Sequence, residues 1–203
     1  FPLNNINEKI LDKNNIDMCA APGGKSFQVL SKKKKIILND INKKRIIILK
    51  ENLKRLNFKT NTTNLDFKKI NEKIKYNFVI VDAPCSAVGT IRKNPEIFFR
   101  KKEPDLKKLT NIQEQMLKKA SKLLNKNGVL LYMVCSFLKI ETVDQIEFFL
   151  KKNQNFKIDK FYVKKNNYLI DGIVKNNIMM TLPTKVQNYN ADGYFAIFLR
   201  KIN

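Results

Sequence analysis

Two cysteines occupy similar places in the sequence, each near the end of a run of apolar residues. Cys85 comes shortly after the run 78–81, and Cys135 directly follows the run 128–134. Runs of this kind are typical of buried strands, and the ligand loops of open α/β sheets lie beyond the carboxyl ends of the strands. We therefore expect both thiols to face one crevice. There, one thiol can attack a substrate covalently while the other assists release of the product.

A loop of small residues follows the first expected strand. Gly23 and Gly24 carry no Cβ, so the backbone can turn sharply and approach a ligand closely. The helix that follows offers free N–H groups at its start. The spacing matches neither the GxGxxG dinucleotide motif nor a phosphate-binding P-loop.

Two acidic residues end the next two expected strands. Asp40 lies 16 residues after Gly24, near the usual offset of about 20 residues for a carboxylate that holds ribose hydroxyls. Asp66 is placed to receive an adenine amino group. An acid at one strand end is commonly a turn or helix cap, but acids at successive strand ends beside a glycine loop indicate a nucleoside cofactor.

Short apolar runs alternate along the chain with longer segments of helical periodicity. We expect strands at 16–19, 35–39, 60–65, 78–81, 128–134 and 194–199, and helices at 25–30, 42–56, 105–124 and 142–152. Strands that are apolar on both faces and alternate with helices predict a doubly wound, mostly parallel α/β sheet covered by helices. The segment 163–187 gives no clear pattern and is expected to be a loop.

Composition limits the class of protein and its partners. The 203 residues suffice for one sizeable domain, and 40 basic against 18 acidic residues give a net charge of +22, which favours a nucleic acid partner. The alternative is that the lysines only solvate the surface. With three scattered cysteines and no histidine, we expect no disulfide framework, no metal site and no His-based triad. No apolar run approaches the roughly 20 residues of a membrane span, and the free thiols suit the cytoplasm.

Four motifs in combination resemble the RNA cytosine-5 methyltransferases of the Nol1/Nop2/Sun family. They are the segments 17–25, 82–96, 132–136 and 191–195. The second of these is most similar to its counterpart in bacterial small-subunit rRNA enzymes. The resemblance implies a seven-stranded, Rossmann-like methyltransferase sheet with an antiparallel edge strand. It also implies S-adenosylmethionine as cofactor and RNA, in particular small-subunit rRNA, as substrate.

The resemblance also assigns roles to residues. Cys135 corresponds to the nucleophile, Cys85 to its partner cysteine, and Asp82 faces the joint active site. The cofactor-binding residues that it implies are Cys19, Ala20, Ala21, Pro22, Gly23, Gly24, Lys25, Asp40, Asp66 and Asp82. We expect the thiol of Cys19 to pack while its backbone serves the cofactor. Lys25, Arg92 and Lys93 are further candidates for phosphate contacts or for shaping the pocket.

The chain departs from the family pattern in three places. Met133-Val134 stands where relatives have Ser/Ala-Thr, and Glu141-Thr142 stands where they have Glu-Asn. Relatives also carry an N-terminal RNA-binding region, whereas 16 residues precede Asp17 here. We therefore expect one catalytic domain over residues 1–203, without that region.

Two other functions compete with RNA methylation. A catalytically idle RNA-binding or assembly protein on the same fold would be compatible with the departures near Cys135, although the intact cysteine pair argues against it. A nicotinamide-dependent dehydrogenase would leave the thiols unexplained and lacks the GxGxxG motif.

Overall fold

The structure is a computed structural model that describes residues 2–162, 174–186 and 189–203. The strands are β1 (Asn15–Asp17), β2 (Ile37–Asn39), β3 (Thr62–Thr63), β4 (Tyr76–Asp82), β5 (Leu124–Val134), β6 (Phe156–Asp159), β7 (Val174–Lys175), β8 (Ile178–Thr181), β9 (Thr184–Val186), β10 (Tyr189–Ala191) and β11 (Tyr194–Lys201). The α-helices are α1 (Ser26–Ser31), α2 (Lys43–Arg55), α3 (Leu106–Leu123) and α4 (Val143–Lys152). Short 3₁₀ helices are η1 (Pro2–Asn5), η2 (Glu8–Asp12), η3 (Phe67–Lys69), η4 (Val88–Thr90), η5 (Pro95–Phe99) and η6 (Lys139–Glu141).

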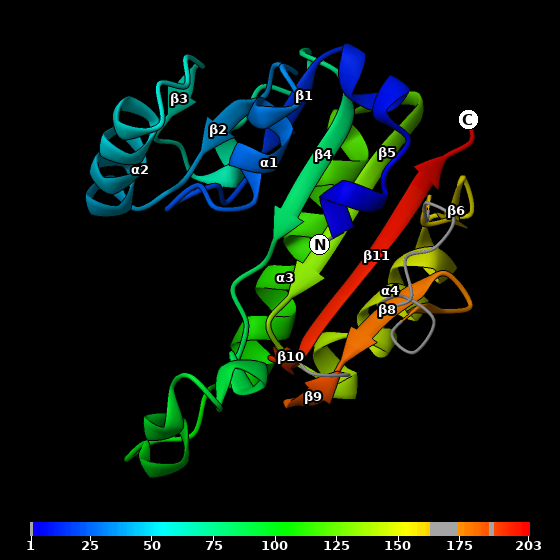
Figure 1. Ribbon diagram of the computed structural model, residues 1–203. Helices are drawn as coiled ribbons and strands as arrows, with labels where there is room; N and C mark the ends of the chain where they lie inside the picture. The colour runs from blue at the N-terminus through cyan, green and yellow to red at the C-terminus, as the bar shows by residue number, and fades with distance from the viewer. Residues whose placement is uncertain (1, 163–173, 187–188) are drawn as a thin grey trace.

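One large sheet organises the chain, with strand order β3-β2-β1-β4-β5-β11-β8-β7 (Figure 1). The five strands from β3 to β5 run parallel, and β11 pairs antiparallel with β5. On its other side, β11 pairs with β8 along its first half and with β6 along its second half. The mixed α/β fold is thus confirmed. The described sheet contains nine strands rather than seven. The two additional strands arise because β6 and β8 both pair with the same side of β11, and because β7 pairs with β8 at the edge of the sheet.

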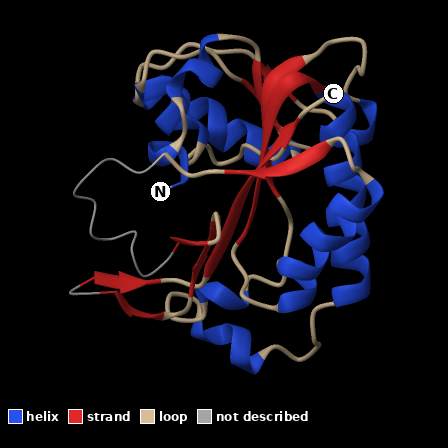
Figure 2. Ribbon diagram, turned by 90° about the vertical axis from the view of Figure 1, so that its right-hand side faces the viewer, coloured by secondary structure: helices blue, strands red, loops and turns tan. Residues whose placement is uncertain are grey.

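Alternating side chains of β4 explain why helices cover both faces of the sheet. Phe78 and Ile80 point into a core with residues of η1, η2, α1 and α2, whereas Val79 and Val81 point into a core with residues of α3 and α4. All four side chains are fully buried. Successive strand residues face opposite sides, so a strand apolar at every position requires two covering layers. Figure 2 shows the sheet between these layers.

Most predicted elements are confirmed, with differences at the edges of the sheet. The predicted strand 60–65 is reduced to the two residues of β3, and β5 begins four residues before the predicted Gly128. The strands β6, β7, β8, β9 and β10 were not predicted, and the last two pair with each other in a separate two-stranded sheet. Lys157 interrupts the apolar pattern of β6, and methionines, which have no strand preference, fill the centre of β8. The expected loop 163–187 lies partly outside the described residues, and its described part contains β7, β8 and β9.

Two further features bear on function. The segment between β4 and α3, which contains η4 and η5, projects from the carboxyl edge of the sheet (Figure 1). Of the helices in the described part of the chain, none combines the length and apolarity that a bilayer crossing needs.

Candidate active site

The two predicted catalytic cysteines follow the carboxyl ends of neighbouring parallel strands. In the β4–β5 ladder, Asp82 lies opposite Met133, and the amide of Ala83 donates a hydrogen bond to the Met133 carbonyl at 3.0 Å. Cys85 and Cys135 are both free and partly exposed. The structure therefore brings the two cysteine loops to the same edge of the sheet, as predicted from the sequence.

Two glycines fasten three segments together beside these cysteines. The Gly89 amide donates to the Cys135 carbonyl at 3.1 Å, and the Gly193 amide donates to the Gly89 carbonyl at 2.7 Å. An ideal Cβ on Gly89 would lie only 2.0 Å from the Gly193 carbonyl oxygen. Only glycine permits such a close approach of two backbones. The segment before β11 is therefore held against both cysteine loops.

A buried carboxylate connects the Cys85 loop to α3. Glu141 is completely buried, and its Oε1 accepts hydrogen bonds from the Ser86 amide at 2.9 Å and from Gln113 Nε2 at 3.1 Å. Its Oε2 accepts a hydrogen bond from Ser86 Oγ at 2.5 Å. The Tyr132 hydroxyl donates to the Glu141 carbonyl at 2.9 Å. Sequence reasoning noted Glu141 only as the neighbour of a family departure and missed this role. Lys139, Asp144 and Glu147 surround Glu141 in the sequence, so no local signal distinguishes it from an exposed acid.

An ion pair joins the predicted cofactor loop to the active site. The ammonium group of Lys25 binds the carboxylate of Asp82, and about a quarter to a third of each side chain is exposed. Lys25 Nζ also lies 5.7 Å from the centroid of the Tyr194 ring. The Tyr194 hydroxyl donates to Met133 Sδ at 2.9 Å, so the ring is fixed against β5. Lys25 therefore forms an ion pair within the site.

The environment of the thiols favours their protonated forms. Burial raises the pKa of Cys135, and Asp82 raises it further, whereas Lys25 lowers it. Burial also raises the pKa of Cys85 to about 12, and a negative charge on Cys135 adds to that shift. Because the thiolate is the reactive form, nearby cations favour reaction at Cys135.

The cofactor loop itself is held by Asp17. Its carboxylate accepts hydrogen bonds from the Cys19 amide at 3.1 Å and from Ser26 Oγ. Complete burial raises the pKa of Asp17 to about 7, against which the Ser26 hydrogen bond acts. The loop also contains a cis peptide bond between Ala21 and Pro22.

The two glycines of this loop have different surroundings. Gly23 has a φ of +113°, and a Cβ there would lie 2.0 Å from the Phe27 ring. A Cβ on Gly24 would have no protein atom within 4 Å. The backbone at Gly24 is thus bare and approachable, which fits a bound nucleoside cofactor. The residues that would hold it are those of the loop 19–25.

The other two predicted cofactor residues have partners within the protein. Asp40 is 2% exposed; its Oδ2 accepts a hydrogen bond from the Ala21 amide at 3.2 Å and lies 3.4 Å from the Arg45 guanidinium. Asp66 caps η3 by accepting from the Lys68 amide at 2.9 Å. Their assignment to the ribose and the adenine stays a prediction.

Arg92 and Lys93, which were candidates for phosphate contacts or for shaping the pocket, form ion pairs with a carboxylate of the protein. They lie 3.0 Å and 2.7 Å, respectively, from the Asp192 carboxylate. Asp192 precedes Gly193, so these ion pairs reinforce the glycine contact between the same segments. The sequence placed Asp192 in the motif 191–195 but did not predict its ion pairs with Arg92 and Lys93.

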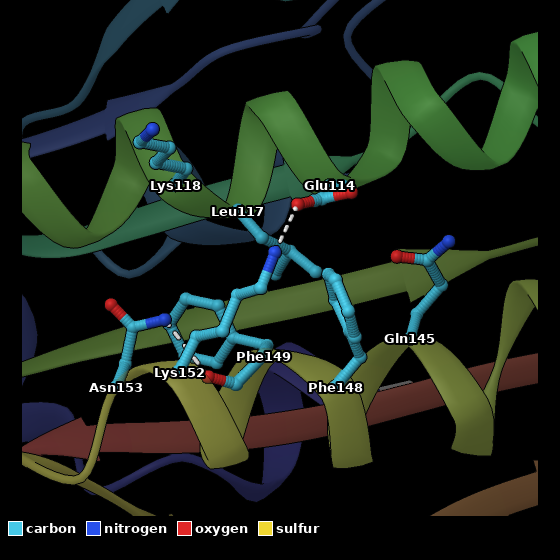
Figure 3. A pocket seen from close by; sticks show the side chains of 8 residues that line it. All are labelled: Glu114, Leu117, Lys118, Gln145, Phe148, Phe149, Lys152 and Asn153. Carbon is cyan, nitrogen blue, oxygen red and sulfur yellow. Dashed lines mark hydrogen bonds and ion pairs between the residues drawn. The ribbon is translucent and has the colours of Figure 1, made fainter.

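Two other features of the described residues do not belong to this site. No cluster of three or more potential metal ligands is present among them. A groove of about 160 Å³ lies between α3 and α4 and contains the Lys152–Glu114 ion pair at 3.1 Å (Figure 3). None of the predicted site residues lines this groove.

Comparison with known proteins identifies the family. Residues 5–200 match the family model described as 16S rRNA methyltransferase RsmB/F. The chain belongs to the RsmB/F family. One relative, the Photorhabdus laumondii protein named ribosomal RNA small subunit methyltransferase B, is 37% identical over 156 residues, which make up 74% of this chain and 35% of the relative. The Proteus mirabilis protein of the same name is 34% identical over 200 residues, 96% of this chain and 42% of that protein.

Solved structures give the same result. The structure of NSun6 from Pyrococcus horikoshii with SFG is similar with a TM-score of 0.79 and 27% identity, over 96% of this chain and 50% of that chain. The RsmB/F membership confirms the family expected from the motifs and its methyltransferase fold. It also confirms the cofactor as S-adenosylmethionine, of which SFG is an analogue. The chain spans about a third to two fifths of the length of the two rRNA methyltransferases.

Proposed function

We propose that this RsmB/F chain transfers a methyl group from S-adenosylmethionine to C5 of a cytosine in RNA, with small-subunit rRNA as the substrate. The reaction proceeds through a covalent bond between Cys135 and C6 of the base. The observation that carries the proposal is the placement of two free thiols after the carboxyl ends of β4 and β5, beside the Lys25–Asp82 ion pair. Family membership supports RNA as the methyl acceptor.

Cytosine C5 is a weak nucleophile, and this fact explains the need for a thiol. Addition of the Cys135 thiolate to C6 moves electron density to C5, which can then accept a methyl group. The bound cofactor supplies that methyl group in electrophilic form, as a sulfonium. Removal of the C5 proton and cleavage of the C6–S bond then restore the Cys135 thiolate. We assign Cys85 to assist this elimination.

The remaining residues act on charge. The Lys25 ammonium lowers the pKa of Cys135 and so favours its thiolate. Asp82, by sharing a proton with N3 of the base, stabilises the negative charge that develops there as the adduct forms. The target base must leave its stack at a cost of a few kcal/mol, so single-stranded RNA loops are the expected substrates.

Denaturing electrophoresis of cysteine variants tests the proposal. We would incubate Cys85→Ala and Cys85→Ala/Cys135→Ala proteins with total RNA and S-adenosylmethionine. The single variant should give an RNase-sensitive band of reduced mobility, because elimination is blocked after Cys135 has attacked. The double variant should give none. A Cys19→Ala/Cys85→Ala protein is the matched control and should keep the band, since the third thiol has no part in the reaction.

The other outcomes assign different functions. A band that persists in the double variant would contradict Cys135 as the nucleophile. Absence of any band, with RNA still retained by the protein on filters, would support the catalytically idle RNA-binding protein instead.

A further inference from the structure

Two adjacent phenylalanines are the most exposed large apolar side chains of the described chain. Phe98 is 74% exposed and Phe99 is 83% exposed. They end η5, within the segment that projects between β4 and α3 (Figure 1). Scattered single apolar residues are normal on surfaces, but two neighbouring aromatic rings on a projection mark an interaction site.

We propose that Phe98 and Phe99 are a stacking platform for single-stranded RNA bases that flank the target cytosine. This inference rests on the proposed function and adds to it a second point of contact with the substrate. Aromatic side chains bind unpaired bases by stacking on their faces, and this requires no particular sequence.

The charge of the surrounding segment fits RNA. Residues 92–102 contain five cations, Arg92, Lys93, Arg100, Lys101 and Lys102, and one carboxylate, Glu96. All six side chains are exposed. Arg92 and Lys93 are ion-paired with Asp192, whereas among the described residues Lys101 and Lys102, which follow the two phenylalanines, form no ion pair. Cations beside aromatic rings are the combination that binds a single-stranded nucleic acid, because the cations hold phosphates while the rings hold bases. An apolar protein partner would gain little from this charge.

The platform is connected to the predicted catalytic cysteines. Arg100, directly after Phe99, donates a hydrogen bond through its NH1 to the Ser86 carbonyl at 3.0 Å. At the other end of the segment, the Gly89 amide donates to the Cys135 carbonyl at 3.1 Å. The projecting segment that carries Phe98 and Phe99 is therefore fixed to both cysteine loops.

A single tryptophan gives a direct test, because the chain contains none. In Phe99→Trp the new indole is the only one, and stacking on a base quenches its fluorescence. We would titrate this variant with a short, unlabelled single-stranded RNA of mixed sequence. Linear polyphosphate at the same phosphate concentration is the control for charge without bases. Phe148→Trp is the matched control variant, since Phe148 is 41% exposed in α4 and lines the groove of Figure 3.

The expected result is quenching of Phe99→Trp by RNA but not by polyphosphate, with Phe148→Trp unaffected by either. Retention of the same radiolabelled RNA on filters measures binding independently. If RNA is retained while the fluorescence of Phe99→Trp stays constant, or if polyphosphate quenches it equally, the platform is overturned and the proposed function stands. An emission shift that grows with protein concentration without RNA would assign the rings to a second copy and would also overturn it. Failure to retain any RNA would overturn both proposals.

Affinity provides a second readout. Phe98→Ala/Phe99→Ala should weaken RNA binding by about tenfold for each stacked base lost. Phe148→Ala should change it by no more than about twofold. Thermal unfolding of Phe98→Ala/Phe99→Ala should match that of the wild type, since both rings are largely exposed. Wild-type affinity of the double variant would overturn the platform.

Discussion

Ser86 and Glu141 are joined by two hydrogen bonds, from the Ser86 amide and from its hydroxyl, to the two oxygens of a fully buried carboxylate. Ser86 directly follows Cys85, and Glu141 lies just beyond the loop of Cys135. The position of Cys85 relative to Cys135 therefore depends on Glu141, which is not itself one of the cysteines.

Removal of this carboxylate should destabilise the protein. In Glu141→Ala, the donors of Ser86 and Gln113 lose a buried acceptor, at a cost of about 1–3 kcal/mol for each group left unsatisfied. We expect the free energy of unfolding, measured by urea denaturation, to fall by about 3 kcal/mol. Glu147→Ala, at an exposed position of α4, is the control and should change it by no more than about 0.5 kcal/mol. Equal stability of the two variants would show that the Glu141 contacts contribute nothing.

Substitution of Gly89 should lower the stability of the protein, whereas substitution of Gly24 should weaken only the binding of the cofactor. Gly89→Ala places a Cβ against the Gly193 carbonyl, so the segments must move apart, and we expect a loss of about 1–3 kcal/mol in stability together with loss of methylation. Gly24→Ala meets no protein atom and should leave the melting temperature unchanged. It should nevertheless weaken S-adenosylmethionine binding in calorimetry, because its methyl group covers the bare backbone of the loop. Wild-type cofactor affinity in Gly24→Ala would contradict the assignment of that loop.

The reactivity of Cys135 should depend on Lys25. Loss of the cation in Lys25→Met raises the pKa of Cys135, so the thiolate fraction at a given pH falls about tenfold per pKa unit. Alkylation of Cys135 by iodoacetamide, followed by peptide mass spectrometry, should become slower in this variant. Lys32→Met, at the end of the same helix, should alkylate at the wild-type rate. Asp192→Asn should accelerate the reaction, because the Asp192 carboxylate raises the pKa of Cys135. A rate unaffected by either charge would contradict this electrostatic control.

Asp17 should make stability fall as the pH rises. Burial raises its pKa from 3.8 to about 7 in the folded protein, so between these values the unfolded chain has lost a proton that the folded protein keeps. The stabilisation is complete below about pH 4, declines as the pH rises toward 7 and is gone above it. The difference in stability between wild type and Asp17→Asn, from urea denaturation, should therefore shrink across this range. A difference that stays constant across this range would contradict the raised pKa of Asp17.

The centre of the parallel part of the sheet could be predicted because β4 and β5 are rich in apolar residues that are buried on both faces. β4 and β5 carry continuous apolar runs that only a sheet covered on two sides can bury. The strands β6 and β8 are shorter and carry no comparably long apolar run. They pair with the side of β11 that β5 leaves free. Their positions follow from tertiary contacts, which local sequence does not encode.

The candidate site shows the same division. Cys85, Cys135 and the glycine loop follow recognisable strands, so their location could be predicted from the sequence. The contacts that fix them, such as Ser86 with Glu141 and Lys93 with Asp192, join residues far apart in the chain. Such pairs are defined only when the sheet brings their loops to one edge.

The position of β11 has a consequence for biosynthesis. This strand lies inside the sheet, between β5 on one side and β6 and β8 on the other, yet it follows all the other described elements in the chain. A ribosome releases the amino-terminal segments first, at roughly 5–20 residues per second. One side of β5 therefore stays unpaired after the parallel strands have been synthesised, until β11 emerges and pairs with it. During this interval the nascent polypeptide exposes an apolar sheet edge, and the contact between Gly193 and Gly89 beside the cysteine loops has not yet formed.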